Sequence, residues 1–367
     1  MSKPALYIGL MSGTSLDGVD AALVGFTAAA GTGTVTPKLL GSHFLAFPTD
    51  LRTRLLALHD SGPDELHRAA GLSIELSRLY AAAVNALTSE AGVAARNVRA
   101  IGCHGQTVRH RPECGYTLQL AAPALLAELT GISVVADFRS RDIAAGGEGA
   151  PLVPAFHAAL FAQPDRRRAI INIGGIANLT ALHPGVAVTG FDTGPGNLLM
   201  DAWAGLHLGQ AFDRDGAWAA AGTVIEPLLA SMLEDAYFAK SPPKSTGRDH
   251  FNLAWLEGFD VAGKRPGDVQ ATLLELTARS IADSTGTALE VWLCGGGTHN
   301  RALVARIGAL LPGTPVGSTA QLGLHPDWVE AVAFAWLAQR ALDAEPGNLP
   351  AVTGAKGPRI LGAIYRA

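Results

Sequence analysis

Residues 8–23 read IGLMSGTSLDGVDAAL, and this stretch predicts a strand, a tight polar turn and a second strand. The first strand is an apolar run over 7–10, and the second begins at Val19. The loop between them contains Gly13 and Gly18, which permit positive φ and a close approach of the backbone to an anion. Main-chain N–H groups and Ser/Thr hydroxyls in such a loop can donate to phosphate oxygens. An ordinary hairpin turn has the same composition, so the loop alone leaves both interpretations open.

Four later motifs accompany this loop. They are CHGQTVRHRP at 103–112, INIGGIANLT at 171–180, FDTGPGNLLMD at 191–201 and PPKSTGR at 242–248. Together the five segments resemble the anhydro-N-acetylmuramic acid kinase family, and they follow the family's order through most of the chain. Their co-occurrence is far more specific than any one of them.

Composition narrows the class of protein. The chain has 367 residues, of which 48% are hydrophobic and 16% charged, which suits a globular protein of two domains. The net charge of −4 gives no basic surplus for nucleic acid or an anionic membrane. Three cysteines without a C-x-x-C pair predict reduced thiols and a cytoplasmic protein. We see no signal peptide and no apolar run long enough to span a bilayer.

The order of predicted elements repeats at about half the chain length. Strands over 5–10, 19–26 and 37–47 precede helices in the first half, and strands over 169–173, 177–182 and 187–191 repeat this opening later. The pattern predicts an α/β fold of two similar domains. The family resemblance implies the actin/hexokinase architecture with an ATP cleft between the domains. We expect domain I at 1–150 plus 345–367, and domain II at 151–344.

The resemblance implies several groups of ATP-binding residues. The first loop supplies Gly13, Thr14, Ser15, Leu16, Asp17, Gly18, Val19 and Asp20. The second glycine turn and its neighbouring strand supply Gly174, Gly175 and Asn178. A glycine run before a helix, Gly295, Gly296 and Gly297, suits adenine or ribose, although a flexible strand-to-helix turn also explains it. Asp17 or Asp20 can face the Mg²⁺ that accompanies ATP, because hard cations prefer oxygen ligands.

Asp192 is the predicted general base. It follows an apolar strand and precedes a stiff Gly-Pro-Gly loop, so its carboxylate is expected at a strand tip. An Asx-turn is the alternative from the residues alone, and the family resemblance favours catalysis. Glu330 is the second candidate: it completes a capping-box-like start with Asp327, and the resemblance implies that it also helps to position a water.

Polar residues after an apolar strand form the candidate sugar site. His104, Gly105, Gln106 and Thr107 are expected there, with Gly194 and Asn197 from the later motif. Arg139 and Asp142 either contact substrate or form a surface salt bridge, and Arg139 suits a lactyl carboxylate because arginine binds carboxylates bidentately.

The resemblance implies a reaction of ATP, water and 1,6-anhydro-N-acetylmuramic acid that yields N-acetylmuramic acid 6-phosphate and ADP, in cell-wall recycling. Two alternatives remain from the residues: a conventional sugar kinase acting on a free hydroxyl, and an ATPase switch. Apolar exposed helices allow a homodimer.

Overall fold

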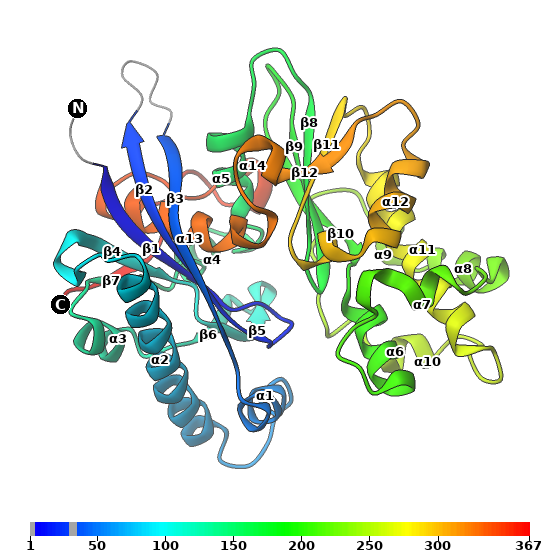
Figure 1. The fold of residues 1–367 in the computed structure, drawn as a ribbon, viewed down its shortest axis with the longest axis horizontal. Helices are drawn as coiled ribbons and strands as arrows, with labels where there is room; N and C mark the ends of the chain where they lie inside the picture. The colour runs from blue at the N-terminus through cyan, green and yellow to red at the C-terminus, as the bar shows by residue number, and fades with distance from the viewer. Residues whose placement is uncertain (1–3, 29–34) are drawn as a thin grey trace. The chain divides into compact units, whose positions relative to one another are not determined.

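The computed structural model describes residues 4–28 and 35–367 and forms two compact units (Figure 1). Unit 1 comprises Met1–Leu160 and Trp328–Ala367, apart from the undescribed residues, and unit 2 comprises Phe161–Asp327.

The sheet of unit 1 has six strands in the order β13-β7-β4-β1-β2-β3. An antiparallel meander of β1 (Ala5–Met11), β2 (Gly18–Ala28) and β3 (Val35–Ala46) occupies one side. On the other side, β4 (Val98–Cys103) runs parallel to β1, and β7 (Val134–Ala136) runs parallel to β4. The last strand, β13 (Ala363–Tyr365), pairs antiparallel with β7, so the C-terminal tail completes the sheet of unit 1.

The two faces of this sheet receive different helices because strand side chains alternate between faces. Ile8 and Leu10 point into a core shared with α2 (Glu65–Glu90). The intervening Gly9 points the other way, where a Cβ would lie 1.7 Å from the carbonyl oxygen of Ala331. The helix on that face is α13 (Val329–Leu342), and only glycine permits so close a backbone approach.

Unit 2 repeats this topology. Its sheet has the order β10-β9-β8-β11-β12, with β8 (Arg168–Ile173), β9 (Ile176–Leu182) and β10 (Thr189–Pro195) as the antiparallel meander. The strands β11 (Glu290–Cys294) and β12 (Val316–Ser318) continue in parallel from β8. The predicted α/β fold of two similar units is therefore confirmed.

The division into units differs from the predicted domain boundaries. The predicted domain II includes all of α13 and all of α5 (Val153–Phe161), whereas α13 and all but the last residue of α5 belong to unit 1. The cause is packing: α13 lies against β1 and β4, and its Trp336 ring lies 5.9 Å from that of Phe156 in α5.

The remaining elements complete the layers. Unit 1 also contains α1 (Thr49–Leu56), β5 (Gln106–Arg111), β6 (Tyr116–Leu120), α3 (Pro123–Thr130), α4 (Ser140–Ala144) and α14 (Pro350–Thr353). Unit 2 also contains α6 (Leu198–Leu208), α7 (Ala217–Ala220), α8 (Glu226–Leu233), α9 (Ala236–Ala239), α10 (Leu253–Glu257), α11 (Pro266–Ser284) and α12 (Arg301–Leu310). Asn300 caps α12, because its Oδ1 accepts from the Leu303 N–H at 3.0 Å.

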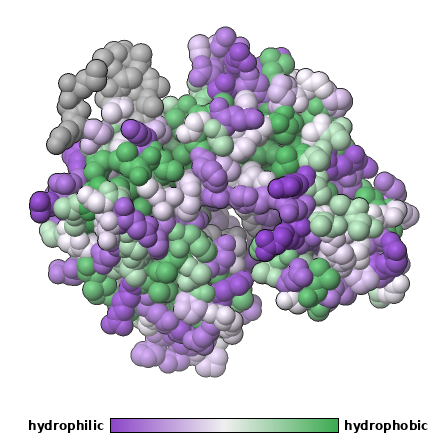
Figure 2. All heavy atoms as spheres, in the orientation of Figure 1, coloured by the Kyte–Doolittle hydropathy of each residue, from purple (hydrophilic) through white to green (hydrophobic). Residues whose placement is uncertain are grey.

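The surface of the described residues mixes polar and apolar side chains on the face shown in Figure 2. The large exposed apolar side chains include Leu66 on α2 and Leu206 on α6. All three cysteines are free, and Cys103 and Cys294 are buried. Among the described residues, none of the helices combines the length and hydropathy needed to cross a membrane.

Gly102 provides a test of the close contact between the unit 1 sheet and α13. An added Cβ would lie 2.0 Å from the Phe334 carbonyl oxygen, so Gly102→Ala must push the helix away. We expect the free energy of unfolding to fall by about 2–3 kcal/mol, as for overpacked cores. Urea unfolding followed by circular dichroism measures this change. The control is Gly71→Ala on α2, where a Cβ meets no atom within 4 Å, and a similar loss there would contradict the explanation.

Candidate active site

The loop after β1 is held by hydrogen bonds from later parts of unit 1. The buried Ser12 hydroxyl donates to the Gly105 carbonyl at 3.0 Å and shares a hydrogen bond of 2.8 Å with the Tyr80 hydroxyl. The Gln106 side-chain amide donates to the Gly13 carbonyl at 3.1 Å. The first predicted ATP loop and the predicted sugar-binding segment are therefore in direct contact.

The tip of this loop carries its exposed polar groups. Thr14 and Asp17 are exposed, and the Ser15 hydroxyl donates to Asp17 Oδ1 at 2.7 Å. Leu16, by contrast, is buried in the core, as is Val19 at the start of β2. Because the side chains of Leu16 and Val19 are buried, these two residues can offer a ligand only their main-chain groups.

The positive φ predicted for the two loop glycines is wrong, whereas the close approach of this backbone to an anion stays a prediction. Positive φ occurs at Leu16 (58°), and neither Gly13 nor Gly18 has it. Gly18 is required for a different reason, because a Cβ there would lie 2.5 Å from both the Phe44 ring and the Leu45 carbonyl oxygen. It permits β2 to pack closely beside β3.

His104 and Arg139 form a buried polar pair beside this loop. Burial, with the nearby charge of Arg139, lowers the pKa of His104 to about 3, so the imidazole is neutral. Arg139 Nη2 donates to His104 Nε2 at 2.9 Å, and Nη1 donates to the Gly149 carbonyl at 2.8 Å. A guanidinium can only donate, so the His104 proton is assigned to Nδ1. A guanidinium stays charged at neutral pH, so Arg139 remains a cation beside the neutral imidazole.

The contacts of Asp142 are structural and contradict the predicted alternative of a surface salt bridge, whereas a contact with substrate stays a prediction. The residue is fully buried. Its carboxylate accepts from the Gly149 N–H at 2.8 Å, from Asn348 Nδ2 at 2.7 Å and from the Thr353 hydroxyl at 2.8 Å. These bonds join α4 to the C-terminal part of unit 1.

Gln106 and Thr107 of the predicted sugar-binding segment are the first two residues of the strand β5. Gln119 Nε2 on β6 donates to the Thr107 hydroxyl at 3.1 Å. Residues 106–111 read QTVRHR, with Val108 as the one apolar residue, so no alternation of polar and apolar residues was available to predict this strand.

In unit 2 the turn at Gly174 and Gly175 contacts the main chain of the motif at 191–201. The Gly174 carbonyl accepts from the Asn197 N–H at 2.8 Å, and the Gly175 carbonyl accepts from the Gly196 N–H at 2.9 Å. A Cβ on Gly196 would lie 2.3 Å from the Gly174 oxygen, so this position requires glycine. The turn and the start of α6 thus form one rigid group, and a helix N-terminus favours anions.

Asp192 lies inside β10 and not at a strand tip, which corrects the prediction. The strand continues to Pro195, and a register shift between Asp192 and Gly194 marks a bulge. Bulges re-aim side chains next to active sites. Proline is tolerated here because β10 is the edge strand of its sheet.

Asp192 belongs to a row of three polar residues that lie side by side on neighbouring strands of the unit 2 sheet. Asp192 lies opposite Asn178 on β9, and Asn178 lies opposite Asn172 on β8, so the three side chains share one face. The Oδ1 atoms of both asparagines are buried and have no hydrogen-bond partner among the described residues. Sequence reasoning missed Asn172, although a polar residue within the apolar run INI was a signal.

The glycine run after β11 serves packing as well as flexibility. A Cβ on Gly295 would lie 2.3 Å from Asn172 Oδ1, and one on Gly297 would lie 2.2 Å from Ile173 Cγ2. Gly296 alone meets no atom within 4 Å. The run therefore brings main chain against the end of β8, beside the polar row.

Glu330 lies half-buried in the first turn of α13, in unit 1. The predicted capping box is absent, since the N-cap is Trp328 and no side chain caps that end. Asp327 instead shares a hydrogen bond of 2.8 Å with His299 Nε2 within unit 2.

No group of three or more His, Cys, Asp or Glu side chains that could hold a metal ion occurs in residues 4–28 and 35–367. Asp17 is therefore a single exposed carboxylate, which suits a cation held mainly by nucleotide phosphates.

Comparison with known proteins decides the family. The model for anhydro-N-acetylmuramic acid kinase matches residues 5–367. The chain belongs to the anhydro-N-acetylmuramic acid kinase family. The protein of that name from Nitrosospira multiformis is 55% identical over 371 residues, which cover 100% of each chain. The one from Thiobacillus denitrificans is 56% identical over 368 residues, covering 98% of this chain and 97% of its own.

Solved structures with similar folds are more distant. Component A of the Acidaminococcus fermentans (R)-2-hydroxyglutaryl-CoA dehydratase has a TM-score of 0.47 at 12% identity, covering 90% of this chain and 96% of its own. A ROK family glucokinase from Streptomyces griseus has a TM-score of 0.42 at 14% identity, covering 92% of this chain and 100% of its own.

Gln106→Ala tests whether the hydrogen bond to Gly13 orders the first loop of this kinase. The change frees the Gly13 carbonyl, so we expect ATP affinity to fall by about 10-fold, as for one lost hydrogen bond to a binding loop. Isothermal titration with a non-hydrolysable ATP analogue measures the affinity. The control is Gln210→Ala at an exposed position, and equal affinities in all three proteins would show that the bond is not needed.

Proposed function

We propose that this family member hydrolyses the anhydro bridge of 1,6-anhydro-N-acetylmuramic acid and phosphorylates O6 with ATP. The products are N-acetylmuramic acid 6-phosphate and ADP. The full-length match to the family model is the observation that carries this proposal.

The proposed reaction balances without a separate acid. The oxygen of water bonds to C1 as the C1–O6 bond breaks. O6 bonds to the γ-phosphorus of ATP as the bond from that phosphorus to the ADP oxygen breaks. One proton of the water passes to the general base. Glycoside hydrolysis ordinarily needs a second carboxyl group to protonate the departing oxygen, and here the phosphoryl group takes that place.

Asp192 is the proposed general base. Its place in the β10 bulge, in line with Asn178 and Asn172, supports an oriented carboxylate. A base must be held within hydrogen-bond reach of the proton it removes. Glu330 is the proposed second carboxylate, which helps to position the attacking water.

The sugar is proposed to meet the polar groups of both motifs. Arg139 keeps its charge beside the neutral His104, which supports its role toward the lactyl carboxylate. Gly105, Gln106 and Thr107 with Gly194 and Asn197 are the proposed neighbours of the hydroxyl and acetamido groups.

ATP is proposed to meet main-chain and hydroxyl donors of the first loop, the turn at Gly174 and Gly175, and the run from Gly295 to Gly297. Asn178 completes this set. Mg²⁺ bound with ATP neutralises phosphate charge during transfer, and the exposed Asp17 is the proposed protein ligand, with Asp20 as the nearest other carboxylate in sequence.

The family's substrate derives from the cell wall, so we infer a role in peptidoglycan recycling in the cytoplasm. We further propose a homodimer, which analytical ultracentrifugation tests directly.

Product analysis in ¹⁸O-labelled water tests the reaction. With Mg-ATP and the anhydro sugar, we expect a phosphorylated sugar that carries one heavy oxygen at C1, because water and not an enzyme group attacks that carbon. Mass spectrometry locates the label. Phosphorylation of an ordinary amino sugar, with no product from the anhydro sugar, would replace the proposal with a conventional sugar kinase.

Asp192→Asn tests the base. We expect kcat to fall by at least about 100-fold, the low end for loss of a general base. Binding of an ATP analogue should stay near normal, since the change removes charge and little volume. Steady-state kinetics and calorimetry measure the two quantities. Asp260→Asn, at an exposed carboxylate, is the matched control. Near-normal turnover of Asp192→Asn would remove Asp192 from the role.

A further inference from the structure

The polar groups of Asp192 are bound by one short segment, residues 237–246, which we call the clamp segment. The Asp192 N–H donates to the Lys244 carbonyl at 3.2 Å, and the Tyr237 hydroxyl donates to the Asp192 carbonyl at 2.6 Å. The Thr246 N–H donates to the carboxylate itself, at Oδ2, at 2.9 Å. Main chain and side chain of Asp192 are therefore fixed by the same segment.

This arrangement results from the position of β10 in the sheet. β10 is the edge strand of its sheet, so within the described part of the chain no further strand binds its outward-facing main-chain groups. The bulge after Asp192 further disrupts the regular ladder to β9. The clamp segment supplies hydrogen-bond partners for the N–H and the carbonyl of Asp192, the proposed general base.

Tyr237 is itself rigidly placed. Its side chain is 3% exposed, and its ring meets that of Phe251 edge-on, with centroids 5.6 Å apart. Its N–H donates to Asp235 at the start of α9, and the Trp255 indole donates to the same carboxylate, each at 2.8 Å. Burial, with the nearby Asp192, raises the pKa of Tyr237, so the hydroxyl remains a donor.

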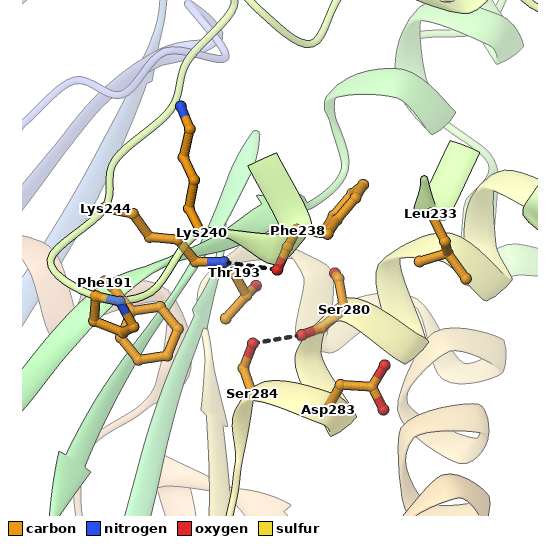
Figure 3. Close-up of a pocket in the computed structure, with 10 residues that line it drawn as sticks. Phe191, Thr193, Leu233, Phe238, Lys240, Lys244, Ser280, Asp283 and Ser284 are labelled. Carbon is orange, nitrogen blue, oxygen red and sulfur yellow. Dashed lines mark hydrogen bonds between the residues drawn. The ribbon is translucent and has the colours of Figure 1, made fainter. Parts of the chain in front are cut away.

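Lys244 binds the two ends of the clamp segment to each other. Its Nζ donates to the Tyr237 carbonyl at 3.3 Å and to the Phe238 carbonyl at 3.5 Å, and lies 4.8 Å from the centre of the Tyr237 ring. Figure 3 shows this ammonium directed at Phe238, above Phe191. The lysine thus joins the end of α9 to the loop that contacts Asp192.

The cavity beside Lys244 has a volume of about 270 Å³, and its hydroxyl groups are already used within the chain. Ser284 donates to the Ser280 carbonyl at 2.7 Å (Figure 3). Ser280 donates in turn to the Thr277 carbonyl at 3.0 Å. Thr193 likewise donates to the Ala177 carbonyl at 3.2 Å. Phe238, Lys240 and Lys244 of the clamp segment line the same cavity.

We propose that Tyr237 is a positioning residue for Asp192, and that Lys244 holds Tyr237 and the adjoining loop in place for that purpose. The inference rests on the proposed base role of Asp192. Tyr237 acts through the main chain of Asp192, which sets the direction of the carboxylate at the bulge, while the Thr246 amide fixes its rotation. Small displacements of a catalytic group cost large factors in rate.

A double-mutant cycle tests this inference. Tyr237→Phe keeps the ring and removes the hydroxyl, so we expect kcat to fall by about 10-fold. KM for the sugar and affinity for an ATP analogue should change by less than about twofold, since binding groups are untouched. In the Asp192→Asn background, Tyr237→Phe should lower the rate by less than about twofold, because its effect passes through the missing carboxylate. Single-turnover assays with radiolabelled ATP give access to the slow variants.

Controls separate positioning from general damage. Tyr116→Phe removes a hydroxyl from an exposed tyrosine of unit 1 and should leave kcat unchanged. Thermal unfolding verifies that Tyr237→Phe is folded. Lys244→Met provides a second variant that keeps the Tyr237 hydroxyl, and we expect kcat to fall by about threefold for the lost donors.

The outcomes are distinguishable. Near-normal turnover of Asp192→Asn overturns the proposed function whatever Tyr237 does. A slow Asp192→Asn with wild-type rates for Tyr237→Phe and Lys244→Met overturns the positioning role alone. Equal losses from Tyr237→Phe in both backgrounds overturn it as well, because the hydroxyl would then act independently of Asp192.

Discussion

In both units, hydrogen bonds to main-chain carbonyl groups hold the turn that follows the first strand of the meander. A turn that offers its N–H groups to a ligand needs its carbonyl groups bound elsewhere, since buried main-chain groups are costly when unpaired. In unit 1 a side chain meets this need, because Gln106 donates to the Gly13 carbonyl. In unit 2 the main chain does so, because the amides of Gly196 and Asn197 donate to the Gly-Gly turn. In each unit the partner comes from a later motif, so the predicted nucleotide and sugar segments share a scaffold.

The duplicated topology places these turns equivalently, and the two units differ in the elements added after each meander. Unit 1 adds the hairpin of β5 and β6, whose first residues contact the loop. Unit 2 adds the helices from α6 to α11 after β10. The clamp segment lies among these added elements of unit 2. The residues that bind Asp192 therefore come from a part of unit 2 that follows the meander.

Apolar runs and turn residues were enough to predict the strands of both meanders and the repeat itself. They misplaced Asp192 because Gly-Pro-Gly is typical of loops, whereas an edge strand tolerates Pro195. They could not show that Leu16 takes the left-handed conformation, which tertiary packing imposes. They also assigned α13 to the wrong side of the domain boundary, because only its contact with Gly9 and Gly102 reveals its unit. The burial of Asp142 depends on Asn348 and Thr353, which lie far away in sequence.

The clamp segment has a second consequence, for the behaviour of the protein at high concentration. An uncovered edge strand is a template on which another chain can add a strand, and this is a common start of aggregation. At Asp192 the N–H and the carbonyl that such a chain would need are both taken, by Lys244 and Tyr237. The proposed positioning of Asp192 and the colloidal stability of the protein therefore place the same requirement on this edge. A substitution that loosened residues 237–246 would expose β10 to intermolecular pairing at the same time as it disordered Asp192.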